Sequence, residues 1–223
     1  MATSQKKQKE KMAQVVAVLE EVYPKASCAL LWQGDPWKLL VMGRLSAQCT
    51  DARVNVVSVP LFERFPTPES MAYANIEEIE DIVRPCGLYH TKAADIKEAS
   101  RQLVEEFGGV LPSDMDSLLS LRGVGRKIAH LLRGDVFHLP AVVTDTHCIR
   151  ICGKLGFYPQ TEKTPHKIEK ILTAIIEPDK SSDFCHRIVQ FGRDTCTARS
   201  PLCHVCPLSH LCAHHMGQAK RKK

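Results

Sequence analysis

A tight turn at residues 122–125, with the sequence RGVG, most constrains what this chain can fold into. Apolar residues recur at helical spacing on both sides of it, from Leu118 to Leu121 and from Ile128 to Leu132. This spacing predicts two short helices joined by a Gly-x-Gly hairpin. We expect Ser113 or Asp114 to cap the first helix, because both residue types are common N-caps.

The hairpin suits a phosphate group. Gly123 and Gly125 can adopt positive φ angles, and without side chains they let another molecule approach the backbone. The second helix starts directly after the turn, where the first amide N–H groups have no intrahelical partner and the helix dipole is positive. A basic pair, Arg126 and Lys127, follows at once. Taken alone, however, the turn is better explained as an ordinary helical hairpin with a solvated basic pair.

Four of the ten cysteines form a compact array near the C-terminus, with the spacing C-x6-C-x2-C-x5-C. The array consists of Cys196, Cys203, Cys206 and Cys212. The other cysteines are scattered through apolar or helical segments, and most are expected to be buried thiols of a reducing compartment. The array therefore indicates a metal centre rather than disulfides. Spacing alone fits either zinc or an iron–sulfur cluster. Nearby histidines keep zinc open: His204, His210, His214 and His215.

Length and charge limit the classes of protein. The 223 residues suffice for one large domain or two small interlocked ones. The formal net charge of +5 is modest, but lysines crowd both ends, at residues 6–11 and 220–223. We expect residues 1–8 to form a tail, and basic ends add sequence-independent attraction to nucleic acid. No apolar run approaches the roughly 20 residues of a membrane span, and we expect the chain to stay in the cytosol.

The rest of the chain has the pattern of helices. Asp35 and Pro36 combine an N-cap with a proline at the first helical position. Besides the two at the hairpin, the expected helices cover residues 9–23, 36–51, 52–65, 69–73, 76–83, 92–107, 145–155, 165–176 and 181–192. No strand alternation persists, so the chain is predicted to be all-α.

These segments together resemble one family. LRGVGRKIA at residues 121–129, followed by VTDTH at residues 143–147, is similar to the helix-hairpin-helix and aspartate signature of the endonuclease III family of DNA repair glycosylases. PWKLLVMGRLSAQCTD at residues 36–51, CGLYHTKA at residues 86–93 and the cysteine array occur in the family's order. The resemblance extends over residues 26–212, which is nearly the whole chain.

The resemblance implies a two-lobed helix-hairpin-helix DNA glycosylase fold with a C-terminal iron–sulfur cluster loop at residues 196–212. The central helical bundle would be residues 26–133 and would contain the helix-hairpin-helix at residues 114–133. The second lobe would combine residues 1–25 with residues 134–223. DNA would lie between the lobes, with the lysine after the hairpin and the aspartate of VTDTH at the entrance.

For the activity, the resemblance implies a bifunctional base-excision enzyme that removes oxidised or damaged pyrimidines and cleaves abasic sites. Lys127 matches the nucleophile of the bifunctional members, although on its own it has the pattern of a solvated lysine. Its amine must be neutral to attack the sugar C1′, which burial and nearby positive charge favour. Attack gives a Schiff base, which acts as the electron sink for β-elimination of the 3′ phosphate. Asp145 matches the family's catalytic carboxylate, although it could equally cap the helix that follows it.

The resemblance also implies how DNA would be held. A base inside a duplex cannot be attacked at C1′, so the nucleotide has to be extruded. Gln48 and Leu88 match the residues that fill the gap, although pattern alone puts Gln48 on the surface and Leu88 in the core. The other positions that match DNA contacts are Gly123, Val124, Gly125, Arg126 and His147. His147 is also compatible with a packed, hydrogen-bonded histidine.

The cofactor implied by the resemblance is a [4Fe–4S] cluster on the four cysteines of the array. Its expected role is structural, because it would fold a loop that offers Arg199 to DNA; redox signalling is a weaker interpretation. The expected partner is double-stranded DNA with damaged bases or abasic sites. We expect a monomer that acts in the cytoplasm, at the nucleoid of a prokaryotic cell.

Two departures from the family pattern bear on the substrate. Family members commonly carry proline where this chain has Arg122, and an aliphatic residue where it has Arg44. These changes suggest an altered pocket or DNA contact and keep open a lyase restricted to abasic sites. An adenine-mismatch glycosylase normally lacks the lysine and carries a catalytic glutamate where this chain has Gly43. A non-catalytic DNA-binding module is the remaining alternative, and the presence of Lys127 and Asp145 together argues against it.

Overall fold

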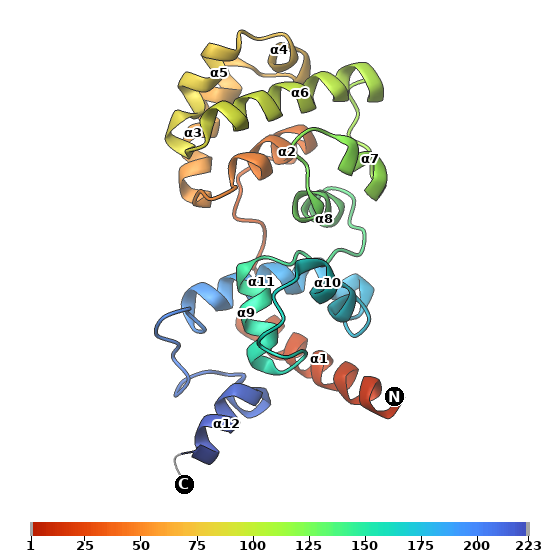
Figure 1. Ribbon diagram of the computed structural model, residues 1–223, viewed down its shortest axis with the longest axis vertical. Helices are drawn as coiled ribbons and strands as arrows, with labels where there is room; N and C mark the ends of the chain where they lie inside the picture. The colour runs from red at the N-terminus through yellow and green to blue at the C-terminus, as the bar shows by residue number, and fades with distance from the viewer. Residues whose placement is uncertain (1, 222–223) are drawn as a thin grey trace. The chain divides into compact units, whose positions relative to one another are not determined.

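The computed structural model describes the backbone of residues 2–221, and every regular element in that range is a helix. The all-α prediction is therefore confirmed (Figure 1). The chain divides into two compact units, Cys28–His138 and the combination of Met1–Ser27 with Leu139–Lys223. Sequence analysis had divided the lobes after residues 25 and 133. Lys222 and Lys223 of the basic C-terminal end lie outside the described residues.

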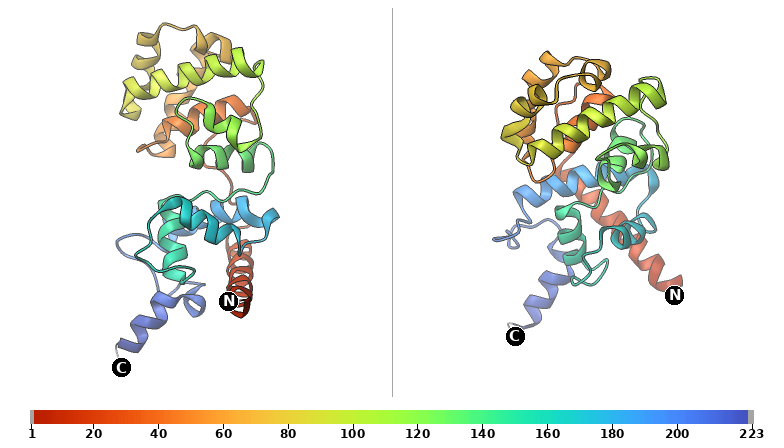
Figure 2. Two further views of the ribbon diagram at one scale, coloured as in Figure 1. Left: turned by 45° about the vertical axis from the view of Figure 1, so that its right-hand side comes forward. Right: turned by 45° about the horizontal axis from the view of Figure 1, so that its top comes forward.

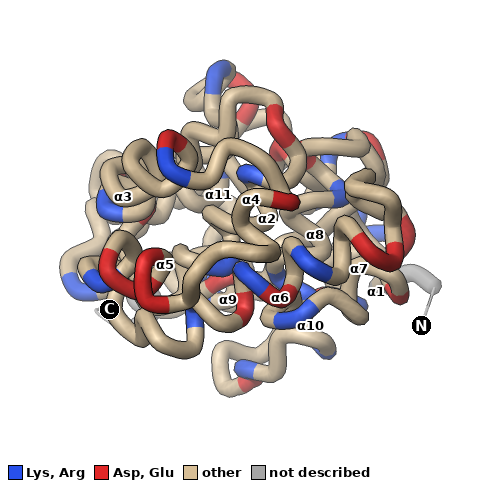
Figure 3. The backbone as a smooth tube through the Cα atoms, turned by 90° about the horizontal axis from the view of Figure 1, so that it is seen from above, with Lys and Arg blue, Asp and Glu red and all other residues tan. Residues whose placement is uncertain are grey.

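The unit Cys28–His138 is a bundle in which the long α6 packs on α4, α5 and α2 (Figure 1). Its helices are α2 (Pro36–Leu45), α3 (Asp51–Arg64), α4 (Pro68–Ala72), α5 (Ile76–Val83), η1 (Arg84–Cys86), α6 (Tyr89–Phe107), α7 (Met115–Ser120) and α8 (Arg126–Asp135). The sequence positions of the acidic residues of α5 can be followed along the backbone in Figure 3. The central element is α2, which also packs on α3 and α8.

The sequence explains why α2 occupies the centre. Asp35 accepts hydrogen bonds from the backbone N–H groups of Trp37 and Lys38, and Pro36 supplies the helical φ angle, so the helix starts at a defined residue. Its apolar side chains are almost fully buried on several sides. Gly43 lets α8 come close, because a Cβ atom there would lie only 3.3 Å from Ile128 Cγ2. The helix that follows the hairpin is thus packed directly against the core helix.

The second unit is built around α11, which lies beside both α9 and α1 (Figure 2). Its helices are α1 (Ala2–Val22), α9 (Thr146–Leu155), α10 (Pro165–Thr173), η2 (Pro178–Lys180), α11 (Ser181–Asp194), η3 (Ser209–Leu211) and α12 (Ala213–Arg221). A separate apolar core joins α1, α9, α10 and α11, with Phe184 and Ile188 of α11 fully buried in it. No helix in the described part of the chain is long and apolar enough to cross a membrane.

One expectation about the N-terminal end of the chain was wrong, and a helix at the C-terminal end was missed. The expected tail at residues 1–8 is helical from Ala2, and α12 was not predicted at all. Both segments consist largely of helix-forming Ala, Lys, Gln and Arg residues with few apolar ones. Hydrophobic periodicity does not detect helices of that composition.

Candidate functional site

The hairpin connects α7 to α8 as predicted. Asp114 caps α7 by accepting the Ser117 N–H at 2.8 Å. Gly123 has a φ of +75°, a conformation that favours glycine, whereas Gly125 is extended with a φ of −96°. Only the first glycine is therefore required by the turn itself.

Val124 anchors the hairpin from within. Its side chain is buried in the core, and its backbone N–H donates to the Leu121 carbonyl oxygen at 3.1 Å. The resemblance matches Val124 to a DNA contact, and in the structure its amide makes a hydrogen bond inside the turn. The next backbone N–H groups along the chain belong to the first turn of α8, where the amides of a helix start point outward.

The N-terminus of α8 is open to an approaching molecule. Its N-cap is Gly125, which supplies no side-chain hydrogen bond, and no atom lies within 4 Å of where its Cβ would be. Arg126 and Lys127 are exposed in the first turn. The pattern of Lys127 as a solvated lysine therefore describes its surroundings in this structure. The helix end thus combines the outward-pointing amides of a helix start, two basic side chains and the open space at Gly125, which together suit an anion.

The two glycines should respond differently to alanine. At Gly123 a Cβ would lie 2.8 Å from Asp95 Cβ and 2.9 Å from Arg44 Nε, at a positive φ. Gly123→Ala should therefore lower the free energy of unfolding by roughly 2–4 kcal/mol, as measured by urea denaturation. Gly125→Ala is the matched control and should change stability by less than about 1 kcal/mol, while its methyl group weakens DNA binding. Equal stabilities of the two variants would contradict this account.

Gln48 and Leu88 share an unusual backbone. They have φ angles of 53° and 51°, and only Gln33 and His138 among the other described non-glycine residues have positive φ angles. Both side chains are exposed, Leu88 by 57 %. Pattern alone had put Leu88 in the core, and that interpretation is wrong. Strained, exposed side chains of this kind are typical of functional positions.

The turns that carry Gln48 and Leu88 lie against each other. The thiols of the adjacent Cys49 and Cys86 interact, and burial together with the Cys49 thiol raises the pKa of Cys86 to about 11. Lys92, which sequence analysis did not single out, is fully buried and donates from Nζ to the Cys86 carbonyl oxygen at 2.8 Å. Burial lowers the pKa of Lys92. The sequence feature that could have identified Lys92 as a buried residue is its position on the apolar face of α6, directly before the buried Ala93.

Asp145 lies in the second unit, where it is the N-cap of α9. Its Oδ1 atom accepts the Cys148 N–H at 2.7 Å, and its side chain is half-buried. The alternative that Asp145 caps a helix is thus correct, and it leaves the second carboxylate oxygen for another role.

His147, in the same turn of α9, packs against α11. A Cβ at Gly192 would overlap His147 Nδ1, so a side chain at that position of α11 is excluded. The same ring nitrogen lies 3.3 Å from the Arg150 guanidinium. The packed, hydrogen-bonded interpretation of His147 therefore describes its surroundings.

The four cysteines of the array line one pocket, together with side chains of α9 and α11. Arg150 of α9 holds the start of the loop, because its guanidinium donates to the Cys196 carbonyl oxygen at 2.8 Å. Burial raises the pKa of the Cys196 and Cys206 thiols. All four cysteines are free of disulfides. Their thiols form one donor set that fits a thiolate-bound group.

Among the described residues, no three His, Cys, Asp or Glu side chains form a group that could hold a metal ion. The comparison with known proteins decides between zinc and an iron–sulfur cluster.

Comparison with known proteins agrees with these features. Residues 41–178 match the model of the HhH-GPD superfamily base excision DNA repair proteins. Residues 196–212 match the iron-sulfur binding domain of endonuclease III, and the cofactor is a [4Fe–4S] cluster. The helical hairpin, the open end of α8 and the cysteine loop thus define a base-excision DNA glycosylase of the iron–sulfur class.

Within that class, the chain belongs to the endonuclease III family. It is 41 % identical to endonuclease III of Synechocystis sp. over 92 % of each chain. It also resembles two solved structures, a non-covalent endonuclease III–DNA complex and a trapped endonuclease III–DNA covalent intermediate. Each match has 37 % identity and a TM-score of 0.88 and covers 95 % of this chain and 98 % of that chain. The protein is a DNA-binding DNA glycosylase with lyase activity at abasic sites.

Proposed function

We propose that this enzyme removes oxidised pyrimidines from duplex DNA and then cleaves the strand through a Schiff base on Lys127. The observation that carries the proposal is the position of Lys127, exposed in the first turn of α8 beside the open hairpin. A phosphate bound at that helix end would bring a sugar of the same strand to the amine. The relative trapped covalently on DNA supports a covalent route. We further propose that the enzyme acts as a monomer, at the nucleoid of a bacterial cell.

In the first step, the Lys127 amine attacks C1′ of the damaged nucleotide, and the bond from C1′ to the base breaks. The electron pair of that bond leaves with the base, which takes up a proton. Because Lys127 is exposed, the bound DNA has to supply the burial that keeps the amine neutral. We assign the second oxygen of Asp145 to stabilise the positive charge on the sugar or to accept the lysine proton.

In the second step, the C1′–O4′ bond of the sugar ring breaks, O4′ takes up a proton, and the amine nitrogen forms an iminium ion with C1′. Loss of a proton from C2′ then sends electrons towards the iminium, and the bond between C3′ and its phosphate oxygen breaks. The strand is cleaved by elimination, and water later releases the lysine. A carboxylate that only activates water could not perform this cleavage, so the nucleophile has to be an amine.

Extrusion of the damaged nucleotide needs side chains that fill the gap in the duplex. We assign this role to Gln48 and Leu88, because both are exposed on turns of positive φ and those turns lie side by side. We assign the cluster ligands to the four cysteines that line one pocket, and the exposed Arg199 on the same loop to a DNA phosphate.

Borohydride trapping tests the proposal. Wild type should form a covalent adduct with a duplex that carries an oxidised pyrimidine and with one that carries an abasic site. Lys127→Ala should form neither, because the amine that we assign as the nucleophile is gone. Lys167→Ala removes an exposed lysine from the first turn of α10 and should trap like wild type.

An adduct on the abasic duplex alone would contradict the assigned substrate and indicate a lyase restricted to abasic sites. Full trapping by Lys127→Ala would show that another residue is the nucleophile.

A further inference from the structure

Asp95, on α6, joins the two arginines that depart from the family pattern. Its carboxylate contacts Arg44 of α2 at 2.7 Å and Arg122 of the hairpin at 2.9 Å. The Asp95 side chain is only 6 % exposed, and those of Arg44 and Arg122 are 16 % and 64 % exposed. A buried carboxylate thus links the core helix to the turn, and it carries one negative charge for two guanidinium groups.

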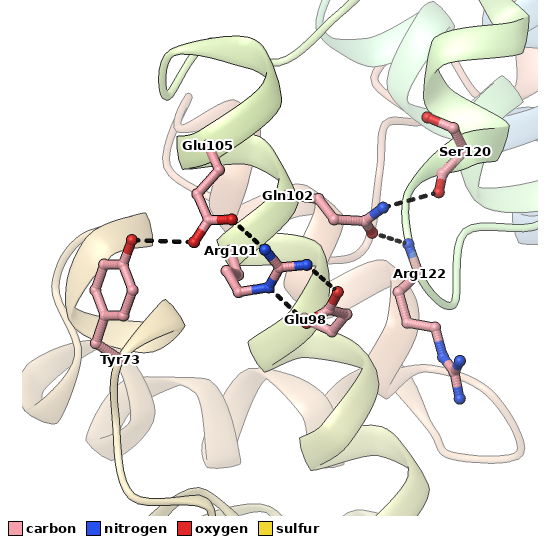
Figure 4. Close-up of polar contacts among 7 residues, drawn as sticks. All are labelled: Tyr73, Glu98, Arg101, Gln102, Glu105, Ser120 and Arg122. Atoms are coloured by element: carbon pink, nitrogen blue, oxygen red, sulfur yellow. Dashed lines mark hydrogen bonds and ion pairs between the residues drawn. The ribbon is translucent and has the colours of Figure 1, made fainter.

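Arg122 is held at a second point through its backbone. Its N–H donates to Gln102 Oε1 at 2.7 Å, and Gln102 Nε2 donates to the Ser120 carbonyl oxygen at 3.3 Å (Figure 4). Proline has no N–H and could not make the first of these bonds. The two ties, one through the side chain and one through the backbone, fix the arginine at the edge of the hairpin.

The surroundings of Arg122 differ from those of a neighbouring arginine on α6. The Arg101 guanidinium is bonded to two carboxylates, Glu98 and Glu105, and its charge is balanced by both (Figure 4). Arg122 instead shares the single carboxylate of Asp95 with Arg44 and leaves most of its side chain in solvent. Its Nε faces Asp95, so the outer edge of the planar guanidinium is directed away from the carboxylate.

We propose that Arg122 is a phosphate-binding residue, fixed by Asp95 and Gln102, that adds one side-chain contact to the backbone amides at the start of α8. Its ligand is a phosphodiester of the bound strand, which arginine recognises through its forked N–H groups. Arg44 and Asp95 are positioning residues: they lie under Gly123, where their atoms fill the space of a Cβ. The inference rests on the proposed function in one respect, namely that the hairpin faces DNA.

The salt dependence of DNA binding tests this inference. The ligand is a duplex with a tetrahydrofuran abasic analogue, which cannot form a Schiff base, so the result does not depend on Lys127. Each phosphate contact contributes about −0.9 to the slope of log affinity against log salt concentration. Between about 50 and about 200 mM salt, wild type should therefore lose affinity about 3.5-fold more than Arg122→Gln does. Arg122→Pro should match Arg122→Gln. Arg101→Gln, which removes the same charge nearby, should keep the wild-type slope.

A second comparison tests the positioning. In an Arg44→Leu/Asp95→Asn background the anchor is gone but Arg122 keeps its charge. There the further change Arg122→Gln should alter the slope by less than it does in wild type. If that double variant does not fold, Gln102→Ala is the alternative background, because it removes the hydrogen bond from the Arg122 N–H to Gln102 Oε1.

An unchanged slope in Arg122→Gln would overturn the phosphate contact, and equal effects in both backgrounds would overturn the positioning. If wild type shows the expected salt dependence of binding but forms no borohydride adduct, Lys127 is not the nucleophile. The proposed role of Arg122 is unaffected by that result.

Discussion

Replacing Asp145 by asparagine should slow base excision and strand cleavage by about 10²–10⁴-fold and leave the protein almost as stable as wild type. The substitution separates the capping role seen in the structure from the catalytic role that we propose for this residue. Its Oδ1 atom caps α9, and an asparagine oxygen can accept the same Cys148 N–H. Asparagine, however, carries no negative charge for the lysine proton or for the developing cation on the sugar. Single-turnover rates on a damaged duplex measure the loss, and thermal unfolding measures the stability.

Asp35→Asn is the matched control for Asp145→Asn. Asp35 is also a half-buried N-cap aspartate, and it accepts hydrogen bonds from two amides of α2. Both variants should unfold within about 0.5 kcal/mol of wild type, since Asn and Asp cap helices about equally well. If Asp35→Asn slowed the reaction as much as Asp145→Asn, the loss of rate would be caused by the changed helix cap. The catalytic assignment of Asp145 would then be wrong.

The second large effect is expected at the cysteine loop. Cys206→Ser should reduce the iron content from about four atoms per chain to below one and lower the free energy of unfolding by roughly 3–5 kcal/mol. The loop buries little apolar surface of its own. Leu202 is 42 % and Val205 63 % exposed, whereas Leu208 is fully buried. A segment with so small a core depends on its cluster for folding. Iron and sulfide analysis measures the first effect, and urea denaturation the second.

Cys28→Ser serves as the control for the loop. Cys28 is a half-buried thiol of the other unit, and burial raises its pKa to about 12. Its replacement should leave the iron content unchanged. Zinc instead of iron in the purified wild type, or full iron in Cys206→Ser, would contradict the assignment of these ligands.

Local patterns in the sequence were sufficient to predict most of the helices. The cap at Asp35, the start of α8 after Gly125 and the cysteine loop depend on neighbours within a few residues, and sequence analysis anticipated each of them. The helix from Ala2 was missed because its first two turns are polar. Leu88 was put in the core because apolar residues usually are, and nothing local indicates its left-handed φ.

The rest depends on contacts between distant segments. Asp95 looks like an ordinary polar residue of an amphipathic helix until α2 and the hairpin bring Arg44 and Arg122 to it. Lys92 lies on the apolar face of α6, and its hydrogen bond to the Cys86 carbonyl exists only once η1 folds back onto that helix. Such pairings join segments far apart in sequence, and hydrophobic periodicity contains no information about them.

The contact between Gly43 and Ile128 has a consequence for how this chain could evolve. An adenine-mismatch glycosylase would need a glutamate at residue 43, but a Cβ atom there lies 3.3 Å from Ile128 Cγ2 and 3.7 Å from Leu131 Cδ2. A side chain at residue 43 therefore requires Ile128 to give way by a few tenths of an ångström. Ile128 follows Lys127 directly in α8, so the fit of α2 against α8 and the position of the proposed nucleophile are linked. A glutamate at residue 43 should be accommodated best when residue 128 becomes smaller in the same variant.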